Sequence, residues 1–162
     1  MNELLHQPGF LGTSANWAAD MTLVVSIFVA VLFTIGVALA VRGQYGPHRL
    51  VQTTAVVINA ILVLWMMILP FRDFVAPADN PGGLSETAVL TTRIHAAVGA
   101  AALLFGLFVT LRGNGLMPKF LQFSNYKAFM RVAYALYMLA TLIGLFVYIT
   151  WFVGNPNPPS YQ

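Results

Sequence analysis

The sequence predicts an all-α integral membrane protein, an antiparallel bundle of four transmembrane helices with a short N-terminal outer segment. The first observation is composition: 59% of the 162 residues are hydrophobic and only 8% are charged. Soluble domains are nearer one quarter charged, so lipid is expected to cover this surface. The second is a set of four long apolar runs, and the third is the short polar stretches between them.

The first predicted span covers about residues 19–42, and the second covers about residues 47–70. The first follows the stretch TSANWAAD, which offers several helix-capping residues, and it stops at Arg42-Gly43. Pro47 suits the first turn of the second helix, and Pro70 is expected to end it. Each run is long enough to cross a bilayer, which takes about 20 residues.

The third predicted span covers about residues 86–112, with Ser85 as its candidate cap. The fourth covers about residues 126–153, with Ser124 or Asn125 as its cap, and it ends before the helix-breaking stretch NPNPPSYQ. Because the connections are short, neighbouring spans are expected to be antiparallel within a single membrane domain, residues 1–162.

The charges predict an orientation. Two of the eight basic residues, Arg72 and Arg93, share one side of the predicted bundle with all five acidic residues. The positive-inside rule then puts the opposite, basic side in the cytoplasm and both termini outside. The tryptophans Trp17, Trp65 and Trp151 map to the outer interface, where their rings prefer to lie. The six residues of the basic side are Arg42, Arg49, Arg112, Lys119, Lys127 and Arg131.

Several classes of function are excluded or disfavoured. The eight basic residues are divided between two ends, so they form no patch for nucleic acid. The lack of cysteine excludes disulfides, thiolate-bound zinc, iron–sulfur clusters and covalently attached haem. No Ser-His-Asp grouping, P-loop or pair of intramembrane carboxylates is present, so we expect neither an enzyme nor a bound cofactor.

Three polar residues mark the second span. His48, Gln52 and Asn59 have the spacing that places side chains on one face of a helix. Asn59 lies near mid-bilayer, where we expect its amide to face the bundle interior and bond to another helix. Two interpretations stay open: a packing asparagine with an interfacial histidine, or a functional polar track.

His95 of the third span is a functional candidate because it is an ionisable side chain inside the membrane. The residues that follow on its face, Gly99, Ala102 and Gly106, are small and predict close approach of a neighbouring helix. The alternative is a neutral packing histidine bonded to a carbonyl or hydroxyl group. Helix rise separates this residue from His48 by about 25 Å, too far for both to bind one haem iron.

Weak metal ligands gather on the outer half. His95 and His6 supply imidazoles and Met21, Met66 and Met67 supply thioethers, a combination that suits Cu(I). Methionine is also a common packing residue, so copper binding stays an alternative.

The fourth span carries a polar seam. Its hydroxyls are expected to bond across the bundle, to Asn59 or His95. A packing seam and a quinone pocket are the two interpretations. The seam consists of Tyr134, Tyr137, Thr141, Gly144 and Tyr148.

Five segments of the chain resemble a known family: PGFLGTSANWAADMTLV, HRLVQTTAVVINAIL, IHAAVGAAALLFGLFV, GNGLMPKFLQFSNYKAFMR and YALYMLATLIGLFVYITWF. They are similar to the bacterial four-helix membrane family of unknown function 420, one branch of which assembles the haem-copper cytochrome aa3 oxidase. On that resemblance His48, His95 and Arg131 match family positions. The chain departs from the branch at Tyr126, where the branch carries a histidine.

The resemblance implies a respiratory context in the bacterial inner (plasma) membrane. The first expectation is a non-enzymatic assembly or accessory protein of a haem-copper oxidase, with membrane lipid and integral oxidase subunits as partners. The second is a permanent small subunit of a respiratory or photosynthetic electron-transfer complex that binds lipid or quinone. The third is a redox protein that binds haem or copper.

Overall fold

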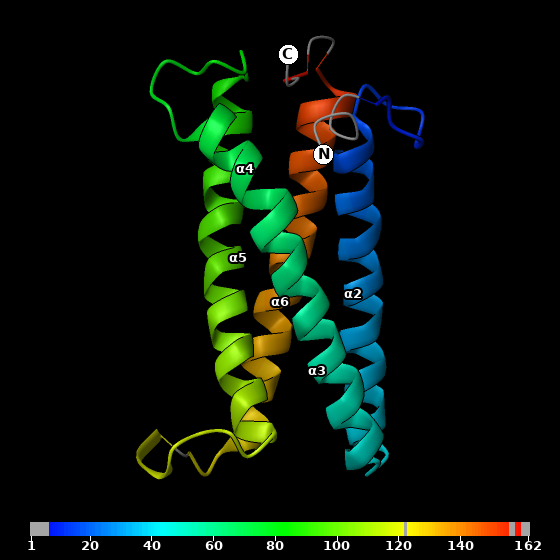
Figure 1. Ribbon diagram of the computed structural model, residues 1–162, viewed down its shortest axis with the longest axis vertical. Coiled ribbons are helices and arrows are strands. Elements are labelled where there is room, and N and C mark those ends of the chain that lie inside the picture. The colour runs from blue at the N-terminus through cyan, green and yellow to red at the C-terminus, as the bar shows by residue number, and fades with distance from the viewer. Residues whose placement is uncertain (1–6, 122, 156–157, 160–162) are drawn as a thin grey trace.

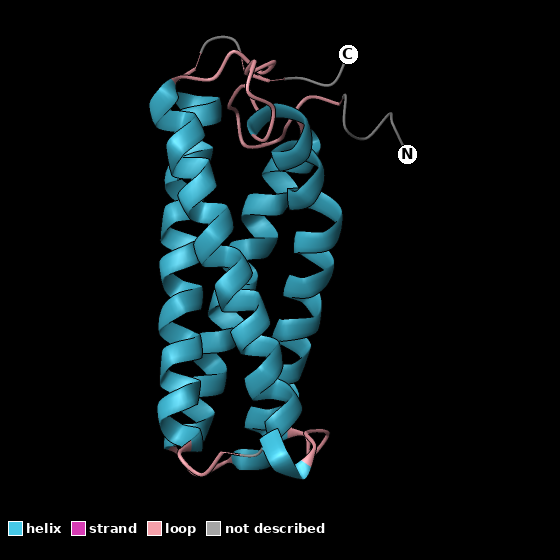
Figure 2. Cartoon of the chain, turned by 90° about the vertical axis from the view of Figure 1, so that its left-hand side faces the viewer, coloured by secondary structure: helices cyan, strands magenta, loops and turns pink. Residues whose placement is uncertain are grey.

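Four long helices run antiparallel along one axis, with loops at the two ends of the bundle (Figure 1; Figure 2). The computed structural model describes residues 7–121, 123–155 and 158–159. Each long helix is apolar enough to cross a membrane, so the predicted four-helix membrane bundle is confirmed. The helices are α2 (Trp17–Val41), α3 with its continuation (Tyr45–Val75), α5 (Glu86–Gly113), and α6 with its continuation (Tyr126–Val153).

The helices form a closed ring in which α2 contacts α3 and α6, and α5 contacts the same two helices. The helix that begins as α3 is inclined across the bundle, beside α2 at one end and beside α5 at the other (Figure 1). Small and β-branched side chains fill the centre, where Val29 of α2 and Ala55 of α3 are fully buried. The Tyr137 ring of α6 closes this core against Phe33, with ring centroids 4.4 Å apart.

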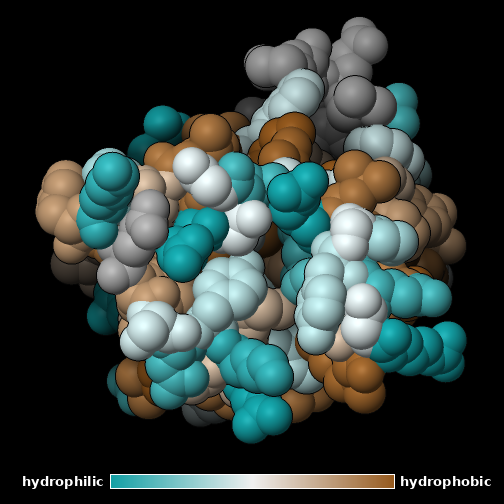
Figure 3. Space-filling view, turned by 90° about the horizontal axis from the view of Figure 1, so that it is seen from below, coloured by the Kyte–Doolittle hydropathy of each residue, from teal (hydrophilic) through white to brown (hydrophobic). Residues whose placement is uncertain are grey.

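The outer surface of the bundle is apolar. Leu64, Leu104 and Leu142, from three different helices, are each more than 60% exposed. A protein surface with so many exposed leucines would be unfavourable in water, so these faces are expected to contact hydrocarbon. The two end surfaces differ from the sides: Figure 3 shows hydrophilic residues gathered over the middle of one end, with hydrophobic residues around its rim.

We call that end the basic end, because it holds the connections 42–44 and 114–125 with their lysines and arginines. The opposite, acidic end holds residues 7–16, the loop 76–85 and the last turn of the fourth helix. Trp65 is 57% exposed toward the acidic end, as expected for an interfacial ring, whereas Trp151 is buried. Trp151 instead donates its indole N–H to Thr92 of α5 at 2.9 Å.

The second helix does not end at Pro70, contrary to the sequence expectation. It runs through α3 (Tyr45–Leu62), a π-helical turn η1 (Val63–Met67), α4 (Ile68–Pro70) and a second π-helical turn η2 (Phe71–Val75). Proline lacks an N–H and its ring crowds the carbonyl four residues earlier. The wider π turns on both sides, with bonds such as Ile68 N–H to Val63 O, accommodate that ring without breaking the helix.

The third helix begins as predicted. Ser85 is its N-cap, and the Ser85 hydroxyl accepts the Ala88 backbone N–H at 3.2 Å. The loop before this helix is held by its own hydrogen bonds, because the Asn80 side-chain amide both donates to and accepts from the backbone of Leu84.

The N-terminal segment folds back over the acidic end through a buried carboxylate. Asp20, in the first turn of α2, is 0% exposed. Its Oδ2 accepts the backbone N–H groups of Phe10 and Leu11 at 2.6 and 2.7 Å, and its Oδ1 accepts the Tyr148 hydroxyl at 2.5 Å. Thr13 in turn lies 2.8 Å from that hydroxyl. One carboxylate therefore ties residues 7–16, α2 and α6 together.

The hydrogen bonds of the Asp20 carboxylate predict that its removal destabilises the bundle. Replacing Asp20 with Ala leaves two backbone N–H groups and the Tyr148 hydroxyl without their acceptor inside the bundle. We expect a loss of roughly 1–3 kcal/mol in the free energy of unfolding. Reversible unfolding in mixed micelles measures it. Tyr148→Phe is the matched control, because it removes one of the three bonds and is expected to cost about 1 kcal/mol. Equal stability of Asp20→Ala and the parent chain contradicts the assignment.

Candidate functional site

His48 lies in the first turn of α3 at the basic end, and its side chain is buried. Its Nδ1 lies 2.7 Å from the backbone oxygen of Gly36 on α2. A carbonyl only accepts hydrogen bonds, so Nδ1 must carry the proton and donate it. In the neutral ring Nε2 then keeps a free lone pair, which can accept a hydrogen bond or coordinate a metal. Gly36 also makes room for Gln52, because an added Cβ would overlap the Gln52 side-chain amide.

The other two polar residues of this face behave differently from each other. Gln52 donates its amide to the Phe33 carbonyl of α2 at 3.2 Å, one helical turn from the contact of His48. Asn59 is buried, as expected, at 8% exposure. Among the described residues, however, no side chain or backbone group forms a hydrogen bond with its amide. The predicted bond from Asn59 to another helix is therefore not observed. The polar track therefore consists of two side chains bound to α2 and one buried amide beyond them.

His95 lies nine residues into α5 and is half-buried. Its Nδ1 donates to the Ala140 carbonyl of α6 at 3.1 Å, which again leaves Nε2 as the ring nitrogen with a lone pair. Gly144, one turn further along α6, lies directly against the ring, since a Cβ there would meet His95 Cε1 at 2.8 Å. Both functional histidine candidates are thus oriented by a backbone carbonyl of the neighbouring helix.

The two histidine contacts lie at different levels of the bundle. Gly36 follows Asp20 by 16 residues on α2, about 24 Å along a helix. Ala140 precedes Tyr148 by eight residues on α6, about 12 Å. Because Asp20 and Tyr148 are bonded to each other, the two acceptor carbonyls differ by at least about 12 Å along the axis. One iron requires both nitrogens within roughly 2 Å, so the two rings are too far apart to share it.

The small face after His95 does not make the predicted close approach. Nothing lies within 4 Å of a Cβ built on Gly99 or on Gly106, although Ala102 between them is buried. Close helix approach occurs instead at Gly36 and Gly144, opposite Gln52 and His95. The prediction was wrong about which glycines are needed, because spacing along one helix does not show where the neighbouring helix carries its large side chains.

The weak metal ligands occupy separate elements. Met21 lies in the first turns of α2, Met66 and Met67 lie in η1, and His95 lies in α5, where its Nδ1 is bonded to α6. His6 lies outside the described residues. Among the residues that the structure describes, no group of three or more histidine, cysteine, aspartate or glutamate side chains has the geometry to hold a metal ion.

The polar seam of the fourth helix divides between two neighbours. The tyrosine hydroxyl groups bond to α2: Tyr134 to Thr34 at 3.1 Å and Tyr137 to the Ser26 carbonyl at 3.3 Å, whereas the Thr141 hydroxyl donates to the Tyr137 carbonyl of its own helix. None of these hydroxyls therefore satisfies Asn59 or His95, as the sequence had suggested. The tyrosine bonds, together with that of Tyr148 to Asp20, fix the register of α2 against α6, while Ala140 and Gly144 face α5.

The basic end holds the remaining candidate, Arg131, which is exposed in the second turn of α6. At the same end, aromatic rings of α5, of α6 and of the connection between them stack on one another, with the centroids of Phe123 in the connection and Phe129 in α6 4.0 Å apart. The Arg112 guanidinium lies 6.0 Å above the Phe123 ring. Tyr126 lies at the edge of this stack, with its hydroxyl 3.5 Å from the Val109 carbonyl. Position 126 is the one at which the branch that the chain resembles carries a histidine.

Sequence reasoning missed the most connected polar group, Asp20. The signal was present, because an acidic side chain in the first turn of a membrane helix needs an internal partner. Its partners Phe10, Leu11 and Tyr148 lie 10, 9 and 128 residues away in sequence, and no local pattern identifies them.

Comparison with protein-family models, with curated proteins and with solved structures finds no match for this chain. The fold itself defines the class of protein, which is a bundle of four helices long and apolar enough to span a membrane. The resemblance to the family of unknown function 420 stays a prediction from the quoted segments.

The contact between His95 and Gly144 gives a test of the site geometry. Gly144→Ala places a methyl group 2.8 Å from the ring and is expected to displace it from the Ala140 carbonyl, destabilising the bundle by about 1–3 kcal/mol. Gly99→Ala and Gly106→Ala are matched controls that meet open space, and they are expected to be neutral or slightly stabilising. Unfolding in micelles compares the three, and a destabilised Gly99→Ala with an unaffected Gly144→Ala contradicts the geometry.

Proposed function

We propose that the protein is a non-enzymatic assembly or accessory membrane protein of a haem-copper oxidase of the bacterial inner membrane. The observation that carries this proposal is the pair of intramembrane histidines, each held by a backbone carbonyl so that Nε2 keeps its lone pair. A ring oriented in this way is prepared to accept a hydrogen bond or a transient metal contact from a partner. The resembling segments around His48 and His95 support the same context.

The use of the other polar side chains supports a binding role rather than a reaction. Gln52, Tyr137 and Trp151 are each bonded to a neighbouring helix, so they hold the bundle together. A histidine that activates a nucleophile within the same chain needs that nucleophile within hydrogen-bond reach. Neither histidine has a nucleophile or a carboxylate as its hydrogen-bond partner among the described residues, because each bonds a backbone carbonyl.

A permanent small subunit of an electron-transfer complex is the second candidate, and the exposed leucines along the helices are compatible with it. Faces of this kind fit equally well against lipid and against apolar helices of another subunit. Stoichiometry separates the two candidates. Affinity purification in mild detergent with mass spectrometry is expected to recover oxidase subunits in substoichiometric amounts for an assembly factor and in equal amounts for a subunit. Recovery of no respiratory subunit would overturn both.

The role of His95 is testable in the native membrane. His95→Gln keeps a polar side chain of similar size but removes the imidazole lone pair. We expect the variant to accumulate normally and oxidase activity to fall at least severalfold, measured as oxygen consumption by membranes. Thr91→Val, which alters a half-buried polar residue one turn away on α5 whose hydroxyl bonds only its own helix, is the control and is expected to leave activity unchanged. Unchanged activity in His95→Gln shows that the histidine only packs.

We also propose that the basic end faces the cytoplasm, because six of the eight basic residues lie there. Single cysteines test this in a chain that has none. Gln44→Cys at the basic end and Asp79→Cys at the acidic end replace exposed residues of the two connections. A membrane-impermeant thiol reagent added to intact cells is expected to label position 79 and not position 44. The reverse labelling pattern would invert the topology.

A further inference from the structure

Arg93 is an exposed cation inside a membrane-spanning helix. It lies seven residues after Glu86, the first residue of α5, which is about 10 Å along the helix. A bilayer is about 40–45 Å thick with a hydrocarbon core of about 30 Å, so each headgroup layer is roughly 5–7 Å deep. Since the 28 residues of α5 are about 42 Å long, the helix matches the whole bilayer when Glu86 lies at the outer surface, and that placement puts the Arg93 backbone just below the headgroups of the acidic end. Helical side chains lean toward the N-terminus, which here directs the guanidinium back toward the headgroups.

The described residues satisfy only part of this guanidinium. One Nη donates to the Val75 carbonyl at the end of η2, at 3.1 Å. The ion pair found in the described part of the chain joins Arg72 to Asp73, and no carboxylate there lies within ion-pair distance of Arg93. An arginine offers five N–H donors, and at the edge of the hydrocarbon core an uncompensated one is costly. The charge therefore calls for an anionic group from outside the chain.

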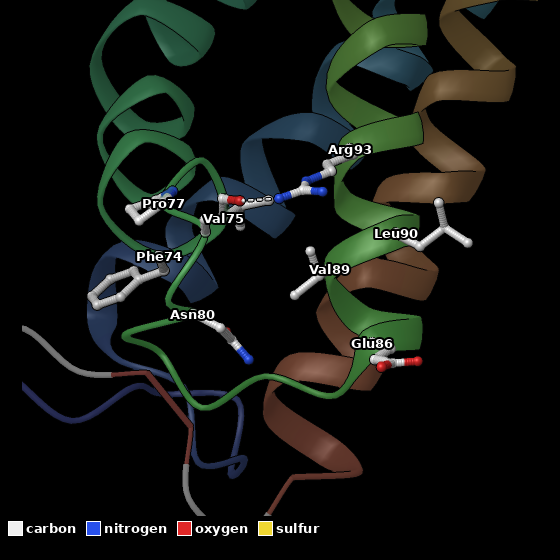
Figure 4. A pocket seen from close by; sticks show the side chains of 9 residues that line it. Phe74, Val75, Pro77, Asn80, Glu86, Val89, Leu90 and Arg93 are labelled. Carbon is white, nitrogen blue, oxygen red and sulfur yellow. Dashed lines mark hydrogen bonds between the residues drawn. The ribbon is translucent and has the colours of Figure 1, made fainter.

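A pocket of about 400 Å³ lies beside it, between α5 and the segment that follows Phe74. Figure 4 shows Arg93 reaching from α5 across this pocket toward Val75, with Val89 on the wall between. The α5 wall of the pocket carries Glu86 at the first residue of the helix, and its carboxylate points away from Arg93 (Figure 4). The Asn80 amide is occupied by the backbone of Leu84, so it does not compete for the same ligand.

We propose that this pocket binds the phosphate group of a membrane phospholipid through Arg93. Charge complementarity and depth favour a lipid, because the guanidinium lies at the level where phosphates lie and its remaining N–H groups match phosphate oxygens. The apolar wall continues down the lipid-facing side of α5 through Leu90 and Ile94, which are 60% and 47% exposed and offer a path for an acyl chain. The site does not depend on the role proposed for the histidines.

Native mass spectrometry of the full chain in detergent tests the proposal. The probes are dioleoyl phosphatidylglycerol and dioleoylglycerol, which has the same chains but no phosphate. Arg93→Gln is expected to weaken phosphatidylglycerol binding about tenfold, the effect of losing a charge-assisted hydrogen bond, and to leave dioleoylglycerol binding unchanged. Arg93→Lys, which keeps the charge, is expected to fall between. Glu86→Gln removes the opposite charge from the same pocket and is expected not to weaken binding.

Three results would overturn the proposal. Equal phosphatidylglycerol binding by Arg93→Gln and the parent chain would remove Arg93 from the site. Competition by excess inorganic phosphate would assign it to a free anion instead of a lipid. Loss of copurifying protein subunits in Arg93→Gln, with lipid binding intact, would assign Arg93 to a protein carboxylate. Circular dichroism of each variant checks that the helices are retained, and Arg93→Lys keeps the comparison valid if Arg93→Gln unfolds.

Discussion

Most of the polar side chains inside the bundle follow one constraint, which is that a polar group away from water is stable when it has a partner within the protein; Asn59 is the exception. Helix carbonyls already accept one bond along their own helix, but each has a second lone pair. His48, Gln52, His95 and Tyr137 all use that second site on a neighbouring helix. Each such bond joins a side chain to one particular backbone position. The polar side chains therefore set the register of helices whose apolar surfaces would permit several.

The glycines follow from the same constraint. A short side chain such as histidine reaches a neighbouring backbone only where that backbone comes close, and a Cβ at Gly36 or Gly144 would occupy the space that Gln52 or the His95 ring needs. The two helix pairs α2–α3 and α5–α6 are thus built on the same plan: an amide or imidazole against a glycine. At the acidic end the Asp20 carboxylate of α2 accepts the Tyr148 hydroxyl of α6, and this bond joins one helix pair to the other.

The helices and their ends could largely be predicted from hydropathy, capping and composition, because these are local properties. Ser85 shows this, since its hydroxyl caps α5 as expected. The facing of each helix could not be predicted in the same way. A membrane helix is apolar on all sides, so its periodicity does not mark the buried face. Spacing alone therefore predicts close contacts at Gly99 and Gly106, whereas the close contact is made at Gly144. The path of the helix beyond Pro70 depends on π turns, which no residue pattern predicts.

The arrangement of the candidate site separates two kinds of contact with a partner. His48 lies at the basic end and its Nδ1 is bound to α2, whereas His95 lies nearer the acidic end and is bound to α6. Because different helix pairs hold the two rings at different levels, a partner that engages one ring does not thereby reach the other. If both act, they act as independent contacts on opposite sides of the membrane midplane. A partner that used both rings would therefore have to contact the bundle at two depths.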